Sequence, residues 1–295
     1  MDRLPNLIIY AIPTFVALII AEMVWAKWRA PSHYHPQDMR TSLLLGLTTF
    51  GTGMLCAAAI TTISLYCYHY RLATIPVVWW AWPLCSILDD FLHYWLHRAG
   101  HRVRWLWASH VNHHSSQHFN LSVALRQSMT GAFFTSLAFR VPLILIGLPI
   151  EMIVFVGAIN TIYEFWTHSD TFGRGPRWFE YLMNTPSHHR VHHAVNPRYL
   201  DRNFAAVFMI WDRMFGTYAE EVEGEKIHYG IIKQLGTFNL MWNIFHEWIG
   251  IIQDLWTAPW RAKLNYFCGV PGWSHDGSRE TSDMIRARWE AQQSG

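Results

Sequence analysis

The sequence predicts an all-α protein, a polytopic membrane bundle of about four to five transmembrane helices capped by a helical, histidine-rich region. Charged residues make up 15% of the chain, whereas soluble domains contain about 25%. The 17 tryptophans suit a protein with aromatic belts at the membrane interfaces. Apolar segments of membrane-spanning length recur along the chain, and together these observations favour a membrane protein.

The apolar segments predict where the chain crosses the bilayer. The first, "LPNLIIYAIPTFVALIIAEMVWA", reaches the roughly 20 residues that a transmembrane helix requires. Trp25, Lys27 and Trp28 follow it as an interfacial anchor, which is not typical of a signal peptide. The predicted spans cover about 4–26, 42–66, 74–97, 127–147 and 151–168.

Basic residues predict the orientation of these spans. Arg98, Arg102, Arg104 and Arg126 follow the third span, so the positive-inside rule places the N-terminus outside and this segment in the cytoplasm. Arg140 falls inside the fourth span, so either that boundary is misplaced or its side chain faces a cavity. The chain is expected to be one domain, 1–295, with a cytoplasmic catalytic region at 97–126 and 168–295.

Other features limit the possible functions. A net charge of +2 does not indicate nucleic-acid binding. The segment "FHEWIGIIQDLWTAPW", 245–260, predicts an amphipathic helix on the membrane surface. The four cysteines are scattered and are expected to be buried thiols without disulfides: Cys56, Cys67, Cys85 and Cys268.

Histidine is concentrated in two short stretches. Of the 18 histidines, 7 fall between His93 and His118 and 4 between His188 and His193. In the first stretch, histidines at i, i+4 spacing share one helix face. The pattern HxxHH then occurs twice, in "HVNHH" and "HRVHH", and on a helix all three imidazoles can point one way. Imidazole is the commonest metal ligand, so the pattern predicts a metal site.

The number of histidines indicates two metal ions. Several protonated imidazoles on one face would repel each other unless a metal holds them neutral. A single tetrahedral zinc cannot use all of them. His168 closes the fifth span at the same membrane depth. The predicted ligands are His97, His101, His110, His113, His114, His168, His189, His192 and His193.

The remaining histidines receive other interpretations. His93 shares the face of the first pair and His188 precedes the second HxxHH pattern, so each is either a ligand or a neighbour of the ligands. His118 is expected to be a neighbour of the ligands or solvated. The others are expected to be structural or solvated: His33, His35, His69, His228, His246 and His275.

Polar residues near the clusters are expected to accept the free N–H groups of the imidazoles and so to orient them. For Asp89 and Asp90, pairing with Arg98 or another base is the alternative. The candidates are Asp89, Asp90, Asn112, Glu164, Asp170 and Asn184.

These motifs resemble the fatty acid hydroxylase/sterol desaturase superfamily of membrane di-iron enzymes. Beyond the histidine patterns, "YWLHRAGHRVRWLWASHVNHHS", "FNLSVALRQS", "EFWTHSD", "NTPSHHRVHHAVNPRYLDRNFAAVFMIWDRMFGTY", "HYGI" and "VPGW" are similar to the alkylglycerol monooxygenase branch and its bacterial relatives. The resemblance covers about 75–275. It implies that His97 and His101 form the first ligand pair and that His93 lies outside it.

The resemblance also implies cofactors and a reaction. It implies two iron ions, O2 as oxidant, a lipid substrate drawn from the bilayer, and hydroxylation of an unactivated C–H bond. In the alkylglycerol branch this carbon adjoins an ether oxygen, and the hemiacetal collapses to a fatty aldehyde and glycerol. That branch takes electrons from tetrahydrobiopterin, whereas other branches use redox proteins. The chain has no GxGxxG fingerprint of its own, so an external donor is expected.

One residue departs from the branch pattern. Arg102 follows the second histidine of the first pair, where the branch carries Glu. A cation in place of a carboxylate beside the metals puts pterin use and the alkylglycerol substrate in question.

Other functions remain open at this stage. A sterol, fatty-acyl or carotenoid hydroxylase or desaturase would carry the same histidine patterns. A metal transporter would place its ligands near the bilayer midplane, often on broken helices. A zinc hydrolase needs three ligands and an open position. The sequence carries no signal for an oligomeric state.

Overall fold

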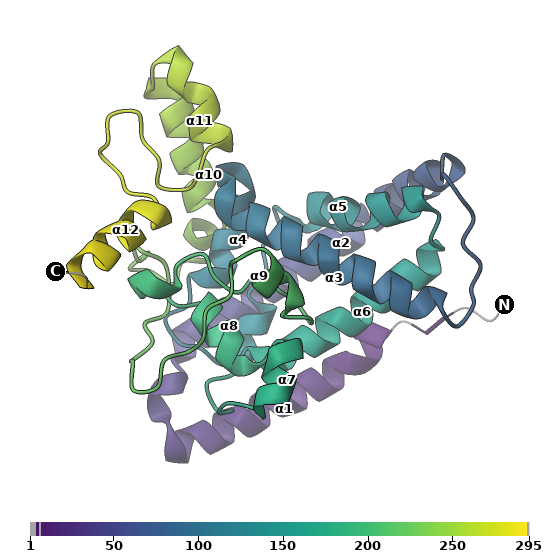
Figure 1. Cartoon of the computed structure of the whole chain (residues 1–295), viewed down its shortest axis with the longest axis horizontal. Coiled ribbons are helices and arrows are strands. Elements are labelled where there is room, and N and C mark those ends of the chain that lie inside the picture. The colour runs from purple at the N-terminus through teal and green to yellow at the C-terminus, as the bar shows by residue number, and fades with distance from the viewer. Residues whose placement is uncertain (1–3, 6, 294) are drawn as a thin grey trace.

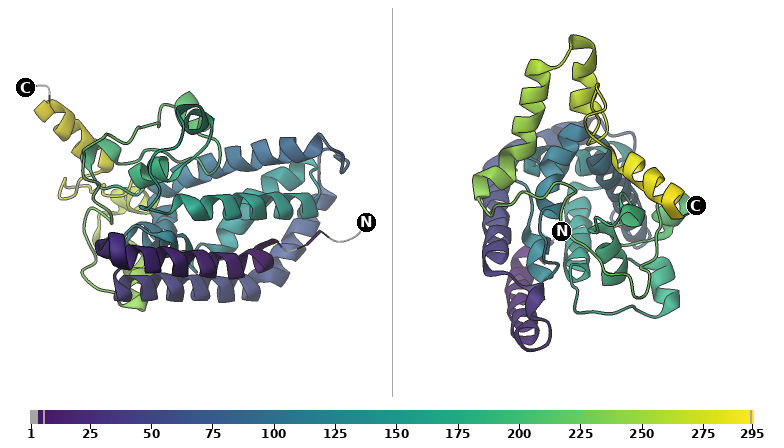
Figure 2. Two further views of the ribbon diagram at one scale, coloured as in Figure 1. Left: turned by 90° about the horizontal axis from the view of Figure 1, so that it is seen from below. Right: turned by 90° about the vertical axis from the view of Figure 1, so that its left-hand side faces the viewer.

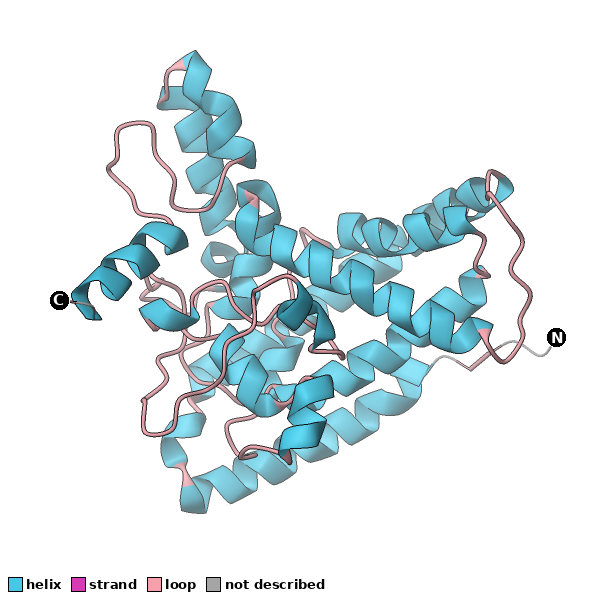
Figure 3. Ribbon diagram, viewed as in Figure 1, coloured by secondary structure: helices cyan, strands magenta, loops and turns pink. Residues whose placement is uncertain are grey.

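The computed structural model describes residues 4, 5, 7–293 and 295, and its regular structure is helical (Figures 1 and 3). The described β pairing is limited to two isolated bridges, Met183–Phe208 and Ala194–Tyr229. The long helices run side by side as a bundle (Figure 2). They are α1 (Leu7–Arg29), α2 (Pro36–His69), α3 (Ala81–Arg102), α5 (Ala132–Ile146) and α6 (Ile150–Thr167).

Two of these helices, α1 and α2, are long and apolar enough to cross a membrane, and α5 is a shorter apolar helix. Leu55 in α2 is 86% exposed, as expected for a side chain that faces lipid. The interior of the bundle forms where α3, α5 and α6 pack through buried residues such as Cys85, Leu143 and Met152. The predicted first span, 4–26, overlaps α1, which begins at Leu7 and continues to Arg29; residue 6 lies outside the described residues.

The third helix begins at Ala81, later than the predicted start near residue 74. The intervening segment packs against the end of α5, where Leu72 N–H donates to Leu145 O (2.8 Å) and Ile75 N–H donates to Gly147 O (3.0 Å). Gly147 has φ +115°, and a Cβ there would lie 2.1 Å from the Ala73 carbonyl oxygen. Only glycine permits this close approach. The two hydrogen bonds hold residues 72–75 against the end of α5 and outside α3.

Shorter helices cover one end of the bundle (Figure 1). A hairpin of α10 and α11 projects sideways from this end, and α12 lies beyond it (Figures 1 and 2). The cap comprises α4 (Arg104–His114), α7 (Arg177–Leu182), α8 (Pro186–His192), α9 (Ile210–Met214), α10 (Leu240–Thr257), α11 (Lys263–Cys268) and α12 (Ser282–Gln293). Single 3₁₀ turns lie at η1 (Pro31–His33), η2 (Leu121–Leu125), η3 (Pro197–Tyr199) and η4 (Trp260–Ala262).

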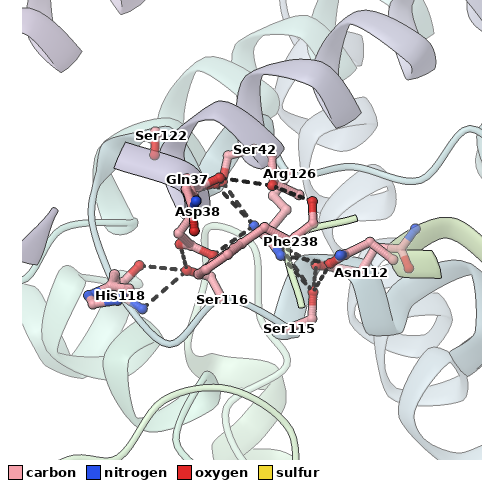
Figure 4. Close-up of polar contacts among 12 residues, drawn as sticks. Gln37, Asp38, Ser42, Asn112, Ser115, Ser116, His118, Ser122, Arg126 and Phe238 are labelled. Carbon is pink, nitrogen blue, oxygen red and sulfur yellow. Dashed lines mark hydrogen bonds and ion pairs between the residues drawn. The ribbon is translucent and has the colours of Figure 1, made fainter. Parts of the chain in front are cut away.

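A buried arginine joins the cap to the bundle (Figure 4). Arg126 is 1% exposed. Its guanidinium donates to Asp38 Oδ1 of α2 (3.1 Å), to the Asn112 carbonyl of α4 (2.8 Å) and to Asn243 Oδ1 of α10 (2.9 Å). Ser115 Oγ also accepts from it (3.0 Å). These bonds fix α4, which carries three of the histidines, against α2 and α10.

Several residues named in the sequence analysis differ from expectation. Arg126 and Arg104, both used to assign the cytoplasmic side, are buried and ion-paired. The four cysteines are free thiols, but only Cys85 is buried; Cys56 and Cys67 are half-buried and Cys268 is exposed. Arg140 does lie within α5, and the nearby charge of Asp89 in α3 offsets part of the cost of burying it.

Candidate metal centre

Nine histidines from α3, α4, α6 and α8 meet at the capped end of the bundle in two groups. Within each group the candidate ligand nitrogens all lie within 4.8 Å of one another. The nine are those that the sequence predicts. The first group is His97, His101, His110, His114 and His192, and the second is His113, His168, His189 and His193.

The first group converges through its Nε2 atoms. His110 Nε2 lies 3.1 Å from His97 Nε2 and 3.1 Å from His114 Nε2. His192 Nε2 lies 3.2 Å from His114 Nε2. His101 Nε2 is buried and has no hydrogen-bond partner. An orphaned imidazole nitrogen is costly unless something binds it, so this atom fits a metal ligand.

The second group has the same arrangement. His168 Nε2 lies 3.1 Å from His113 Nε2 and 2.9 Å from His189 Nε2, and His193 Nε2 lies 3.1 Å from His189 Nε2. Four buried nitrogens thus face one point. This donor set suits a first-row transition metal, because neutral imidazole is a ligand such metals favour.

Backbone carbonyls determine which nitrogen faces inward. The Nδ1–H groups of His97, His168 and His192 donate to the carbonyls of Phe204, Glu164 and Arg202, each at 2.9 Å. A carbonyl only accepts, so each Nδ1 must carry the proton, and a neutral ring then presents a lone pair at Nε2. Lone pairs that face each other repel, and a cation between them removes the repulsion.

The two groups are neighbours. The rings of His114 and His193, one from each group, stack with centroids 4.3 Å apart. Adjacent histidines in each HxxHH pattern point to different groups, because successive residues on a helix are about 100° apart. His113 and His114 divide in this way, as do His192 and His193. The geometry therefore fits two metal ions close together.

Burial shifts the titration of these imidazoles. Desolvation, reinforced by the neighbouring imidazoles, holds the pKa well below its ordinary value for His110, His113, His114, His189, His192 and His193. All six are therefore neutral at pH 7, as metal binding requires.

Acid is expected to destabilise the metal-free protein. As pH falls below about 6.5, the ordinary histidine pKa, the unfolded chain binds protons that the folded chain excludes. The free energy of unfolding should then fall by up to about 1.4 kcal/mol per pH unit for each such histidine. Thermal unfolding of chelator-treated protein at pH 7.5, 6.0 and 5.0 measures this loss. Equal midpoints at all three values would contradict the buried, neutral state of the rings.

Four of the six residues expected to orient imidazoles have other partners, and the side chain of a fifth has none. Asp90 accepts from the backbone N–H groups of Val207 and Phe208 and from Trp211 Nε1, so it fixes the loop before α9. Glu164 does orient His168, but through its backbone carbonyl. The side chain of Asp89 binds Asn160, Asp170 accepts from Tyr229, Asn184 donates to the carbonyls of Ala205 and Ala206, and the buried amide of Asn112 has no hydrogen-bond partner.

One carboxylate that contacts a predicted ligand was not predicted from the sequence. Asp201 Oδ1 lies 3.3 Å from His101 Nδ1, and its other oxygen accepts from Arg102 (3.4 Å). Asp201 has φ +54°, a left-handed backbone conformation that turns the chain sharply after α8. Arg102 also donates to Asp283 of α12 (2.5 Å). Arg102 thus holds the residue that orients His101.

Replacing Asp201 with Asn is expected to weaken metal retention about 10–100-fold, the usual effect of losing the hydrogen-bond partner of a metal ligand. The neutral amide no longer stabilises the proton on His101 Nδ1 as a carboxylate does. Competition with a chelator measures the change. Asp283→Asn is the matched control, because it breaks an Arg102 contact without touching an imidazole. Equal metal loss from both variants would contradict the role of Asp201.

The other histidines lie outside both groups. His93 Nε2 lies 3.2 Å from Glu164 Oε1, and the buried His188 contacts Thr185. Several of the remaining histidines also contact defined partners. His33 pairs with Asp170, His35 stacks on Phe238, His118 donates to Ser32 O and His275 contacts Tyr266.

A cavity of about 710 Å³ reaches the first group. It lies between α4, α10 and the segments 230–235 and 271–285, and its walls include His101, His114 and His192. The remaining lining is mixed, with apolar residues such as Trp107 and Leu200 beside charged Arg104 and Glu247. A molecule with an apolar chain and a polar head fits such a lining.

Comparison with known proteins gives consistent similarities. The fatty acid hydroxylase family model matches residues 82–217. The chain is 36% identical to alkylglycerol monooxygenase of Danio rerio over 286 residues, which is 93% of this chain and 61% of that protein. It is 36% identical to the Homo sapiens enzyme over 282 residues, 92% and 61% of the two chains. An ornithine lipid hydroxylase of Rhizobium tropici is 27% identical over 144 residues, 46% and 43% of the two chains.

The chain therefore spans 61% of the length of these vertebrate relatives. No solved structure matches it.

Proposed function

We propose that this chain is a membrane di-iron monooxygenase that hydroxylates a lipid, because the fatty acid hydroxylase family model matches residues 82–217. The observation that carries the proposal is the pair of adjacent histidine groups, whose Nε2 atoms converge on two points. The relatives that match over most of the chain are alkylglycerol monooxygenases, so we propose the ether-linked carbon of a 1-O-alkylglycerol as the site of attack.

In this proposal each group holds one iron. His97, His101, His110, His114 and His192 hold the first, and His113, His168, His189 and His193 hold the second. Bound iron would supply the activation of O2 and the oxidant for the C–H bond. The protein supplies neutral ligands, oriented by Asp201 and by the carbonyls of Phe204, Glu164 and Arg202.

The proposed reaction inserts one oxygen atom of O2 into a C–H bond of the substrate. The ether R–CH2–O–R′ takes one oxygen atom from O2, and two electrons and two protons reduce the other to water. The product R–CH(OH)–O–R′ is a hemiacetal, which breaks its C–O bond to give a fatty aldehyde and glycerol. The electrons come from an external donor, which we propose to be tetrahydrobiopterin, with a redox protein as the alternative.

The cavity beside the first group is the proposed binding site for the substrate. Its apolar walls can hold part of the alkyl chain, while Arg104 and Glu247 can hydrogen-bond the glycerol hydroxyls. Arg102 is not among the lining residues, and its guanidinium pairs with Asp201 and Asp283. The replacement of Glu by Arg at this position therefore alters the support of His101 rather than the cavity wall.

The bundle places this centre at one end of the apolar helices. We propose that α1, α2, α3, α5 and α6 cross the membrane and that the centre faces the cytoplasm, as the basic residues after the third span predict. A metal transporter is disfavoured by the same arrangement, because its ligands would lie near the bilayer midplane. The identity of 36% to alkylglycerol monooxygenase, against 27% to the ornithine lipid hydroxylase, favours an alkylglycerol as the substrate.

The test combines metal content with turnover. Elemental analysis of detergent-purified protein is expected to give two irons per chain. With tetrahydrobiopterin and a 1-O-alkylglycerol, fatty aldehyde should form in air and not under nitrogen. Two irons with turnover of a sterol or fatty-acyl lipid instead would refute the alkylglycerol assignment while retaining the oxygenase. No oxidation of any lipid by iron-reconstituted protein would refute the proposed function.

A further inference from the structure

The α10–α11 hairpin carries an apolar surface that the rest of the chain leaves uncovered. Exposed fractions are 64% for Ile252, 85% for Trp256, 77% for Trp260 and 71% for Leu264. A soluble protein rarely exposes so many large apolar side chains together, and such patches mark interaction sites.

These residues form one face of the hairpin. Trp248, Ile252 and Trp256 are spaced four residues apart and so lie along one side of α10. The opposite side of α10 is buried, through Ile244, Ile251 and other residues. Trp260 and Leu264 continue the apolar surface around the turn into α11. The exposed face is therefore continuous from α10 to α11.

The acidic and basic residues of the hairpin lie in different places. Glu247 and Asp254 accept hydrogen bonds from Arg104 (2.7 and 2.6 Å), and Asp254 also pairs with Arg279. These acids are thereby neutralised on the inner side. Arg261 and Lys263, beside Trp260 at the turn, leave the tip basic. Tryptophan next to basic side chains suits the headgroup layer of a membrane with anionic lipids.

The hairpin is placed to lie along a membrane surface. It projects sideways from the metal-bearing end of the bundle (Figures 1 and 2). Trp248 Nε1 donates to Thr130 Oγ1 (3.2 Å), just before α5 begins. Trp105 contacts Phe134 of α5 and Phe267 of α11 with centroids 4.8 and 6.2 Å away. The apolar side of the hairpin therefore joins the side of the bundle that includes the apolar helix α5.

We propose that the α10–α11 hairpin is an interfacial anchor whose apolar face lies in the headgroup layer of the leaflet at the metal-bearing end. The ligand is the bilayer itself, with anionic phospholipid favoured at the tip. Trp242 and Ile249 of α10 also line the cavity. The anchor would place the cavity mouth at the level of lipid headgroups. The anchor rests on the proposed crossing of the membrane by the bundle, and this consequence rests also on the proposed substrate site.

Photo-crosslinking of the whole chain in nanodiscs of mixed zwitterionic and anionic phospholipid tests the anchor. Trp256→p-benzoylphenylalanine places the photoreactive group on the proposed face. Met284→p-benzoylphenylalanine is the matched control, because Met284 is 50% exposed and lies on α12, which lines the cavity through Ser282 and Ile285 and is not part of the hairpin. Both substitutions are at exposed positions, and unchanged iron content and thermal unfolding confirm that each variant is folded.

We expect phospholipid adducts, identified by mass spectrometry, at position 256 and none at position 284. Absence of lipid adducts at 256, or equal yields at the two positions, would overturn the anchor. An adduct between position 256 and a second protein chain in place of lipid would also overturn it. None of these outcomes depends on turnover, so they are distinguishable from failure of the proposed reaction.

Discussion

Replacing His192 or His113 with alanine is expected to abolish turnover and to release about one of the two irons per chain. Each belongs to a different histidine group, so each variant should empty a different site. Loss of a residue that orients a ligand lowers metal affinity or activity about 10–100-fold. Removal of the ligand itself should have a larger effect. We therefore expect turnover to fall by more than about 100-fold. Elemental analysis and aldehyde release measure the two effects.

His188→Ala is the matched control for this prediction. His188 is also buried and precedes the second HxxHH pattern, but it lies outside both groups. The control should keep both irons and most of its activity. Full turnover by the His113 or His192 variant, or equal iron loss from the His188 variant, would show that the ligand assignment is wrong. Recovery of all three variants in the membrane fraction excludes failed insertion.

Replacing Arg126 with methionine is expected to lower the free energy of unfolding by about 3–5 kcal/mol, the usual cost of leaving one member of a buried ion pair without its partner. The change leaves the Asp38 carboxylate without its guanidinium, and Ser115 and Asn243 lose a donor. The loss should be visible as a lower thermal midpoint in detergent and, because α4 is released, as faster loss of iron to a chelator.

Two further variants test whether the cost of Arg126→Met comes from burial of the ion pair and from the unpaired charge that the substitution leaves. Arg174→Gln removes an exposed ion pair with Glu220 and should cost at most about 1 kcal/mol. The double variant Asp38→Leu/Arg126→Met removes both buried charges and should be more stable than Arg126→Met alone, because no unpaired charge remains. A double variant no more stable than the single one would refute the explanation by an uncompensated charge.

Much of the architecture follows from local patterns in the sequence. The length and apolarity of α1 and α2 are local properties, so their existence was predictable. The start of α3 was not, because it depends on bonds from Leu72 and Ile75 to the distant end of α5. Likewise, Arg126 has the charge of a cytoplasmic residue, and its burial depends on Asp38 and Asn243, which are remote in sequence.

The site shows the same division. Histidine spacing identifies eight of the nine candidate ligands, because i, i+3 and i+4 positions share a helix face. The ninth, His168, follows from its place at the end of the fifth predicted span. Their separation into two groups depends on how four helices pack. The residues that orient the rings were harder to predict, since any residue has a carbonyl, and neither Phe204 nor Arg202 differs in this from its neighbours. The charge of Asp90 and its position near the first histidines predict that it orients an imidazole, yet it binds backbone amides in the segment before α9.

The bonds of Arg126 also constrain the order of events during biosynthesis. Its partner Asn243 is 117 residues further along the chain. At translation rates of about 5–20 residues per second, the arginine waits on the order of ten seconds for that partner. Asp38, Asn112 and Ser115 are made earlier, but α4 can pack against α10 only when the chain has reached Asn243. A ribosome-bound intermediate that ends before α10 should therefore retain a bound metal less well than the completed chain.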